Sequence, residues 1–231
     1  QQGFNPNGVD GVDSDGRAAL HQAAAGGATE CIQLLVQHGG SLDTPDRHNM
    51  TPLHVAAHHG QAAAGRELVA MGASLASRDI FGNTPLMVAA RGGERGECVR
   101  ALVQLGASVD ERDSSVGSTP LHMAALGGTA GSDRALLELG ADIEAVDIRG
   151  FRPLHVTAIR DLPGALAVTQ LLVQAGANLS VQDITGHPPL HWAVKKGKVT
   201  LVELLLSAGA DPMARDNMGI TPAQMAETFG Q

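Results

Sequence analysis

The phrase TPLHVAA at residues 51–57 returns as TPLMVAA at 84–90 and TPLHMAA at 119–125. Looser copies read AALHQAA at 18–24, RPLHVTA at 152–158, PPLHWAV at 188–194 and TPAQMAE at 221–227. An aspartate precedes every copy, and successive aspartates are 33, 33, 34, 34, 36 and 33 residues apart. They are Asp13, Asp46, Asp79, Asp113, Asp147, Asp183 and Asp216. This period is typical of a helical repeat array rather than of one compact core.

Each copy has the chemistry of a turn followed by the start of a helix. In six copies a glycine follows the aspartate at the third or fourth position, and glycine tolerates the positive φ of a tight turn. Asn49 takes that place in the second copy, and asparagine is the next most tolerant residue. The threonine suits a helix N-cap and the proline suits the first helical position. Leucine and the paired alanines then face the neighbours.

A second amphipathic segment follows the phrase. Residues 30–39 and 199–209 place apolar side chains at i, i+3 and i+4, which is the spacing of a helix. The segments end at a glycine, which suits a helix C-cap. These glycines are Gly39, Gly72, Gly106, Gly140, Gly176 and Gly209. Each full repeat is therefore expected to be a pair of helices with a projecting turn.

The repeat resembles the ankyrin repeat, whose signature T-P-L-H-x-A recurs about every 33 residues. The resemblance implies an all-α ankyrin-repeat solenoid of helix-turn-helix pairs with projecting β-hairpin-like loops. We expect a single ankyrin-repeat domain over residues 13–231, with repeats that start near 13, 46, 79, 113, 147, 183 and 216, after a disordered lead-in over residues 1–12. Extra residues, RDLPGAL at 160–166, lengthen the fifth repeat, and the seventh repeat stops after its first helix.

The composition argues against several other classes of protein. The net charge is −8, so a nucleic-acid partner is not expected. Cys31 and Cys98 fall in equivalent second-helix positions two repeats apart, which is too far for a disulfide, and both are expected in the core. Reduced thiols favour an intracellular location, cytoplasmic or nuclear. No apolar run reaches the about 20 residues of a membrane span, so no membrane insertion is expected. The first residue is Gln rather than Met, so we expect this chain to be a piece of a longer protein. We also expect the domain to be monomeric.

Motifs of enzymes and cofactor sites are absent from the sequence. There is no Walker-type loop and no GxSxG, HExxH or CxxC, so neither catalysis nor a cofactor is expected. Five histidines, at the TPLH position, are expected to hydrogen-bond one repeat to the next: His21, His54, His122, His155 and His191. His48, His58 and His59 lack a neighbouring ligand set, which argues against a metal and leaves a pH-sensitive contact or plain surface. Trp192 indicates core packing, with base stacking as the alternative.

In ankyrin-like stacks, partners commonly dock on the concave face, which is lined by the turn tips and by the residues after the alanine pair. These positions carry seven of the chain's sixteen basic residues but, of its twenty-four acidic residues, only Asp15. We call the seven the basic stripe: Arg17, Arg47, Arg91, Arg149, Arg160, Lys195 and Lys196. An acidic protein is thus predicted to place positive charge on its binding face.

Apolar residues accompany the basic stripe. We call them the apolar ridge: Ile80, Phe81, Val116, Ile148, Phe151 and Ile184. A row of exposed apolar residues suggests a contact surface, although loops also tolerate such residues without a function. The stripe without Arg17, the ridge, and five further residues form the predicted partner-binding set; the five are His48, His58, His59, Leu126 and Ile159.

These observations predict a protein–protein interaction module, part of a larger intracellular regulatory or scaffold protein. The partner is expected to be a protein segment in which acidic residues flank apolar anchors. The alternative is a small polyanion, a nucleotide or an oligonucleotide in the basic groove. Such ligands usually stack on aromatic rings, and only Phe81 and Phe151 supply rings there.

Overall fold

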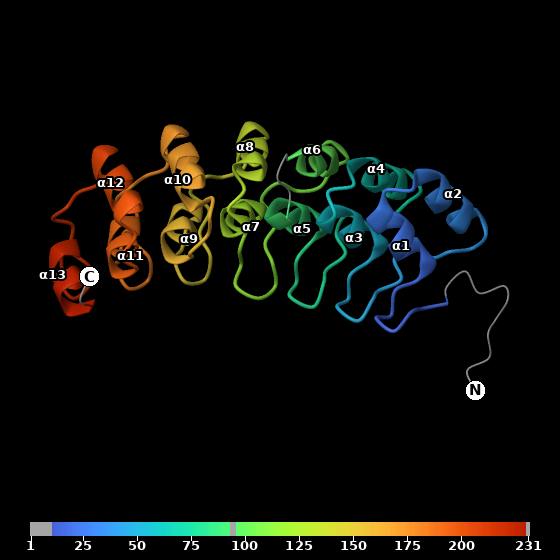
Figure 1. Cartoon of the computed structure of the whole chain (residues 1–231), viewed down its shortest axis with the longest axis horizontal. Coiled ribbons are helices and arrows are strands. Elements are labelled where there is room, and N and C mark those ends of the chain that lie inside the picture. The colour runs from blue at the N-terminus through green and yellow to red at the C-terminus, as the bar shows by residue number, and fades with distance from the viewer. Residues whose placement is uncertain (1–10, 93–95, 230–231) are drawn as a thin grey trace.

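The computed structural model describes residues 11–92 and 96–229, which form thirteen helices and no strand. The helices lie in two rows along the long axis of the molecule, and loops project from the inner row (Figure 1). The inner row contains α1 (Ala19–Gly26), α3 (Pro52–His58), α5 (Pro85–Gly92), α7 (Pro120–Gly127), α9 (Pro153–Ile159), α11 (Pro189–Lys195) and α13 (Pro222–Phe229). The outer row contains α2 (Thr29–Gln37), α4 (Ala62–Ala70), α6 (Glu97–Gln104), α8 (Ala130–Glu138), α10 (Ala165–Gln174) and α12 (Val199–Ser207). The all-α solenoid is confirmed.

The TPLH phrase begins an inner helix in the predicted way. Thr51 has an extended backbone, with φ −83° and ψ 167°, and Pro52 is the first helical residue. The Thr51 N–H donates to Nδ1 of His54 at 3.2 Å, so the histidine satisfies one of the donors that a helix start leaves free. Thr119 and His122 repeat this contact at 3.2 Å.

The aspartate at the start of each repeat closes its turn with its own side chain. Asp46 Oδ1 accepts hydrogen bonds from the backbone N–H groups of His48 and Met50, at 2.8 and 2.9 Å. Asn49 has φ 57° and is the non-glycine residue that adopts positive φ within the described ranges. The turn acids therefore serve the fold, and Asp46 is buried.

Two recurring hydrogen bonds join adjacent repeats. His54 Nε2 donates to the carbonyl oxygen of Asn83 in the next turn at 3.1 Å, and the Ile80 N–H donates to the His48 carbonyl at 3.0 Å between the turn tips. The other histidine pairs are His21 with Met50, His122 with Phe151, His155 with His187 and His191 with Ile220. The structural role predicted for the five histidines is confirmed.

The core is a thin double layer of small and branched side chains. The leucine of the phrase is almost fully buried in successive repeats, as at Leu53, Leu86 and Leu121. The alanine pairs between the inner helices, such as Ala89 and Ala90, are also buried. Small residues at these positions allow neighbouring helices to pack closely, which explains how a chain with 2% aromatic residues forms a core.

The structure corrects one prediction about the cysteines. Cys98 is buried, and loss of solvation raises the pKa of its thiol to about 11. Cys31 is exposed, so its assignment to the core is wrong. The reason is its place in the stack: Cys98 faces α4, whose Arg66 acts on the thiol, whereas α2 is the first outer helix of the described chain.

Other predicted boundaries also need adjustment. The loop of the fifth repeat spans 160–164, because Ala165 and Leu166 of the expected insertion already belong to α10. The lead-in expected over residues 1–12 lies outside the described residues apart from residues 11 and 12. Among the described helices, none is both long and apolar enough to cross a bilayer.

Candidate partner-binding face

The turn tips and the inner helices line two hollows along the solenoid. The first hollow, near α3 and α5, encloses about 420 Å³, and the second, near α7 and α9, encloses about 330 Å³. Met123 of α7 lines both, so the hollows adjoin. Of the predicted binding residues, three line the first hollow, namely His58, Phe81 and Arg91. Seven line the second, namely Val116, Leu126, Arg149, Phe151, Ile159, Arg160 and Lys196.

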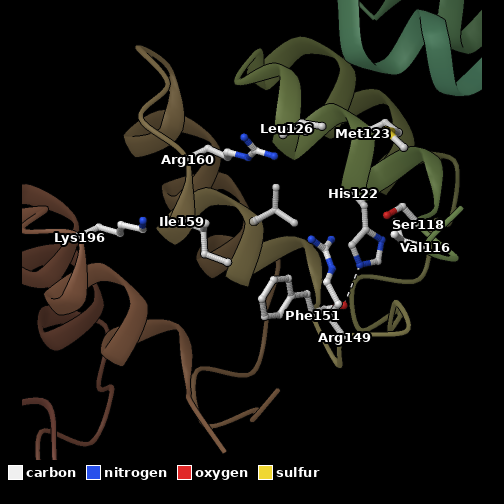
Figure 2. A pocket seen from close by; sticks show the side chains of 11 residues that line it. Val116, Ser118, His122, Met123, Leu126, Arg149, Phe151, Ile159, Arg160 and Lys196 are labelled. Atoms are coloured by element: carbon white, nitrogen blue, oxygen red, sulfur yellow. Dashed lines mark hydrogen bonds between the residues drawn. The ribbon is translucent and has the colours of Figure 1, made fainter. Parts of the chain in front are cut away.

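The second hollow has an apolar floor and a basic rim. Its side chains come from the turn tips, from α7 and α9, and from the residues that follow α9 and α11 (Figure 2). Val156 at the floor is buried, while Leu126 and Ile159 are half-buried. Arg160 and Lys196 are exposed at the rim, and no side-chain ion pair or hydrogen bond within the described chain engages either one.

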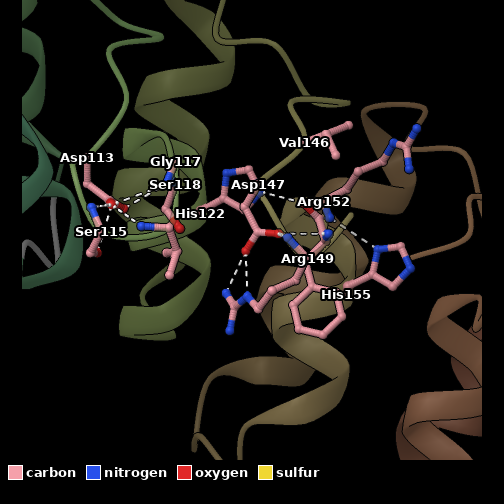
Figure 3. Close-up of polar contacts among 12 residues, drawn as sticks. Asp113, Ser115, Gly117, Ser118, His122, Val146, Asp147, Arg149, Arg152 and His155 are labelled. Atoms are coloured by element: carbon pink, nitrogen blue, oxygen red, sulfur yellow. Dashed lines mark hydrogen bonds and ion pairs between the residues drawn. The ribbon is translucent and has the colours of Figure 1, made fainter. Parts of the chain in front are cut away.

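Arg149 differs from these two cations because its charge is compensated. Its Nε and Nη2 donate to Asp147 Oδ2 at 2.9 and 2.5 Å, and the Asp147 side chain is fully buried (Figure 3). The guanidinium also lies 4.6 Å from the centre of the Phe151 ring. Arg149 is therefore a fixed wall of the second hollow rather than a free positive charge.

An aromatic cluster borders the second hollow on the α11 side. Phe151 and Trp192 meet edge to face with ring centres 5.6 Å apart, and Trp192 Nε1 donates to Asp183 Oδ2 at 2.8 Å. Lys195 lies 4.9 Å from the centre of the Trp192 ring. Trp192 is half-buried and bonded within its own repeat, as its core-packing interpretation predicted.

The first hollow has a methionine-rich floor. Met50 and Met87 line it beside Phe81, and methionine adapts its shape to many partners. Loss of solvation lowers the pKa of His58, and the positive charges of Arg17 and Arg91 lower it further. His58 is therefore neutral near pH 7. Arg91 lines this hollow together with Asp79, whereas Arg17 pairs with Asp46 at 3.7 Å.

The apolar ridge is exposed in part. Ile80, Phe81, Ile148 and Ile184 are exposed by 56, 61, 69 and 68%. Val116 and Phe151 are only half-buried and turn toward the second hollow. Seven predicted binding residues line neither hollow: Arg47, His48, His59, Ile80, Ile148, Ile184 and Lys195. The ridge is thus a row of turn tips next to the hollows.

Sequence reasoning missed the floor of the hollows. Met123 and Val156 line the second hollow, and Val88 lines the first. All three occupy the x position of TPLHxA, directly after the histidine position. The same position holds Trp192, for which the sequence indicates core packing, and the sequence alone does not distinguish contact with the core from contact with the open face.

The histidines on and behind this face contact each other or act as hydrogen-bonding groups. No cluster of three potential metal ligands occurs among these residues, and His58 and His59 contact each other edge to face with ring centres 5.2 Å apart. The TPLH histidines are buried, and burial lowers the pKa of His155 to about 4. Burial also lowers the pKa of His54, His122 and His191, so these three and His155 are neutral hydrogen-bonding groups near pH 7.

Comparison with known proteins agrees with this architecture. The family profile described as Ankyrin repeats (3 copies) matches residues 2–79, 66–147 and 134–216. The crystal structure of the human ASB11 ankyrin repeat domain is similar, with 25% identity, a TM-score of 0.78, and coverage of 91% of this chain and 92% of that chain. The ankyrin repeat domain of Bcl-3, a member of the IkappaB protein family, has 31% identity, a TM-score of 0.75, and coverage of 94% of this chain and 100% of that chain.

A comparison with curated protein sequences finds no match. The profile match nevertheless spans most of the chain, and the repeat period, the turn geometry and the histidine contacts all agree with it. This chain belongs to the ankyrin repeat family.

Proposed function

We propose that this chain binds a partner protein along the face that contains the two hollows, and that the bound segment carries acidic and apolar residues. Ankyrin repeats are generally protein–protein interaction modules. The partner chemistry is our inference from the side chains on this face. Apolar anchors would enter the hollows, and acidic residues would lie beside the basic rim.

One observation carries this proposal. Arg91, Arg160 and Lys196 are exposed cations next to apolar hollows, although the chain as a whole has a net charge of −8. Five of the seven turn aspartates are buried and accept hydrogen bonds from the backbone of their own turns, whereas Asp79 is half-buried and lines the first hollow beside Arg91. The residues that line the second hollow, where Arg160 and Lys196 form the rim, include no carboxylate. Complementary charge speeds and orients encounter, whereas buried apolar anchors supply most of the affinity.

Charge reversal on this face tests the proposal. Immobilised wild-type protein and the variant Arg91→Glu/Arg160→Glu would be incubated with lysate of the source organism at several salt concentrations. We expect partners held by the wild type to be depleted at least about tenfold on the variant, which corresponds to about 1.4 kcal/mol. We also expect retention by the wild type to fall as salt rises.

A matched charge reversal on the outer row provides the control. Arg66 of α4 and Arg134 of α8 are exposed, so Arg66→Glu/Arg134→Glu changes the net charge equally but away from the hollows. This control should retain the wild-type partners. Equal retention by both variants and the wild type would contradict the proposed face, and equal loss on both would indicate a response to net charge alone.

A further inference from the structure

The loop inserted in the fifth repeat contacts the repeats on both sides of it. On one side, Leu162 and Gly164 pack on Gly128 of the fourth repeat, where a Cβ at Gly164 would lie 1.7 Å from the Gly128 carbonyl oxygen. On the other side, Lys198 of the sixth repeat pairs with Asp161 at 3.4 Å and donates to the Arg160 carbonyl oxygen. These contacts fix the loop across three repeats.

This fixation places Arg160 over the second hollow. Arg160 leaves α9 in an extended conformation, with φ −93° and ψ 137°, whereas the equivalent Lys196 after α11 stays near φ −95° and ψ 2°. The insertion therefore turns the chain away from the helix where the hollow begins. Arg160 and Lys196 then lie on the rim of the same hollow from successive repeats (Figure 2).

The hollow has the size and chemistry of an anchor site. Its volume of about 330 Å³ is at the lower end of the range for small-molecule sites, about 300–1,000 Å³, which suits one or two side chains. Val156, Ile159 and Leu126 offer apolar contact at its floor. Because Arg149 is already paired with Asp147, the charge left to bind an acidic group comes from Arg160 and Lys196.

We propose that this hollow is the principal anchor site for the partner, and that it takes one large apolar side chain with a carboxylate close to it in the partner sequence. The apolar side chain rests on Val156 and Ile159, and the carboxylate contacts Arg160 and Lys196. This inference rests on the proposed function and narrows it to one hollow and one short motif. The first hollow, with the single rim arginine Arg91, becomes the secondary contact.

Random peptide display tests the motif. Phage-displayed peptides of twelve residues would be selected on the wild-type protein, and the enriched sequences would be synthesised with a fluorescent label for polarisation measurements. We expect an apolar residue within about one to three positions of Asp or Glu, because an extended chain advances about 3.3 Å per residue between floor and rim. Enriched sequences without acidic residues would overturn the inference.

Four variants locate the binding site of those peptides. We expect Arg160→Glu/Lys196→Glu to weaken binding at least about tenfold, and Ile159→Ala, at a half-buried position, to weaken it about fivefold. Arg91→Glu and the outer-row control Arg134→Glu should change affinity less than about twofold, as distant charges do at physiological salt. Ile159 and Met123 methyl resonances should shift on titration, while those of Ile80 stay in place.

The outcomes separate this inference from the proposed function. Peptides that lose affinity with Arg91→Glu but keep it with Arg160→Glu/Lys196→Glu would overturn the anchor site and leave the binding face intact. Peptides that respond to none of the rim variants would bind elsewhere and count against both. A display that enriches no sequence on the wild type would likewise count against both.

Discussion

The joint between repeats 2 and 3 and the joint between repeats 3 and 4 are built differently. The first has the His54–Asn83 and Ile80–His48 hydrogen bonds. At the second, Met87 replaces the histidine, and the described residues show no bond between Ser114 and the Phe81 carbonyl. The turn of repeat 4 has one more residue than its neighbours, and Ser114 lies against Gly82 instead.

The second joint relies on close packing of backbone. A Cβ added at Gly127 of α7 would lie 2.1 Å from the Arg91 carbonyl oxygen of α5, whereas the equivalent Gly92 of α5 would meet His58 of α3 at 3.3 Å. The two inner helices thus approach more closely where the polar bonds are missing. One repeat pattern therefore accommodates two ways of joining neighbours, and stability along the stack should vary from joint to joint.

The outer row of repeat 4 also departs from its neighbours. Asp133 of α8 occupies the position that Val99 holds in α6, and both side chains are fully buried. Among the described residues, neither carboxyl oxygen of Asp133 has a hydrogen-bond partner. In the next repeat, Thr169 at the same position is buried but bonded to the Thr157 hydroxyl at 2.9 Å. Repeat 4 therefore carries a buried polar group that no described neighbour satisfies.

Replacing this carboxyl should have the largest effect. Loss of solvation raises the pKa of Asp133 to about 8 from an ordinary 3.8. The pKa of Asp133 is higher in the folded chain than in the unfolded chain, so protonation of Asp133 favours the folded chain. This contribution to stability is complete below about pH 4 and is lost as the pH rises to about 8. Asp133→Val should raise the free energy of unfolding by up to about 4 kcal/mol at pH 7, measured by urea denaturation.

The pH dependence distinguishes this cause from simple repacking. The gain from Asp133→Val should be smallest near pH 4 and grow toward pH 8, whereas Asp133→Asn removes the titration and keeps a buried polar group. A gain that stays constant from pH 4 to pH 8 would show that Asp133 is not neutral in the folded chain.

The helix contact at the second joint should rank next. Gly127→Ala forces α5 and α7 apart at a backbone oxygen that has no flexible end to move, so we expect a loss of about 3 kcal/mol. Gly92→Ala is the matched variant at the equivalent position, and its contact at 3.3 Å is relieved by a small shift. It should change stability by less than about 1 kcal/mol, since alanine also favours the helix. Equal losses would remove the distinction between the two joints.

Much of this architecture was predictable because each repeat position has a single structural demand. The turn needs a residue that accepts positive φ, the helix start needs a cap, and the histidine position faces the next turn, so Asn49 and His54 could be assigned from sequence. The place of Met123 in the wall of both hollows could not be assigned from sequence, because its position borders the core and the open face. The spacing between neighbouring helices decides which of the two its side chain lines.

Other features depend on neighbours that a single repeat does not specify. Cys31 has the same local pattern as Cys98, yet only the latter has an outer helix on that side among the described residues. The pairing of Arg149 with Asp147 depends on side-chain rotamers within one turn, which the sequence does not specify. The basic stripe therefore has fewer unpaired positive charges in the structure than the sequence predicts.

Exchanging the residues that distinguish the joints should give intermediate effects of opposite sign. His54→Met removes the bond to Asn83 and should cost about 2 kcal/mol, because buried polar groups lose a partner. Met87→His should raise the free energy of unfolding by about 1 kcal/mol, because the new ring can donate to the Ser118 carbonyl oxygen. That oxygen accepts a bond from the Asp113 N–H, just as the Asn83 carbonyl oxygen accepts one from the Asp79 N–H. Thermal or urea unfolding of both variants checks the signs. A loss with Met87→His would mean that the closer packing excludes the ring.

The smallest effect is expected at Arg78, which lies just before Asp79 and links the turn of repeat 3 to the turn of repeat 4. Arg78 donates to the Arg112 carbonyl oxygen at 2.8 Å and pairs with Glu111, and their side chains are about one third or more exposed. Exposed pairs of this kind contribute about 0–1 kcal/mol, so Arg78→Met should cost less than about 1 kcal/mol.

The value of this variant lies in its coupling to Met87→His. Arg78 links the two turns that lack a histidine bond, while Arg100–Glu138 at 2.6 Å and the Asp142 N–H bonded to Asp110 join other parts of these repeats. Removal of Arg78 should therefore cost less once a histidine bond joins the turns, and a double-mutant cycle measures the difference. Arg112→Met is the matched control, because Arg112 donates to the Val146 carbonyl oxygen and so links the turn of repeat 4 to the turn of repeat 5. At that joint His122 is already bonded to Phe151, and the Ile148 N–H to the Val116 carbonyl oxygen. If Arg112→Met costs as much as Arg78→Met, the arginines contribute independently of the joints that they cross.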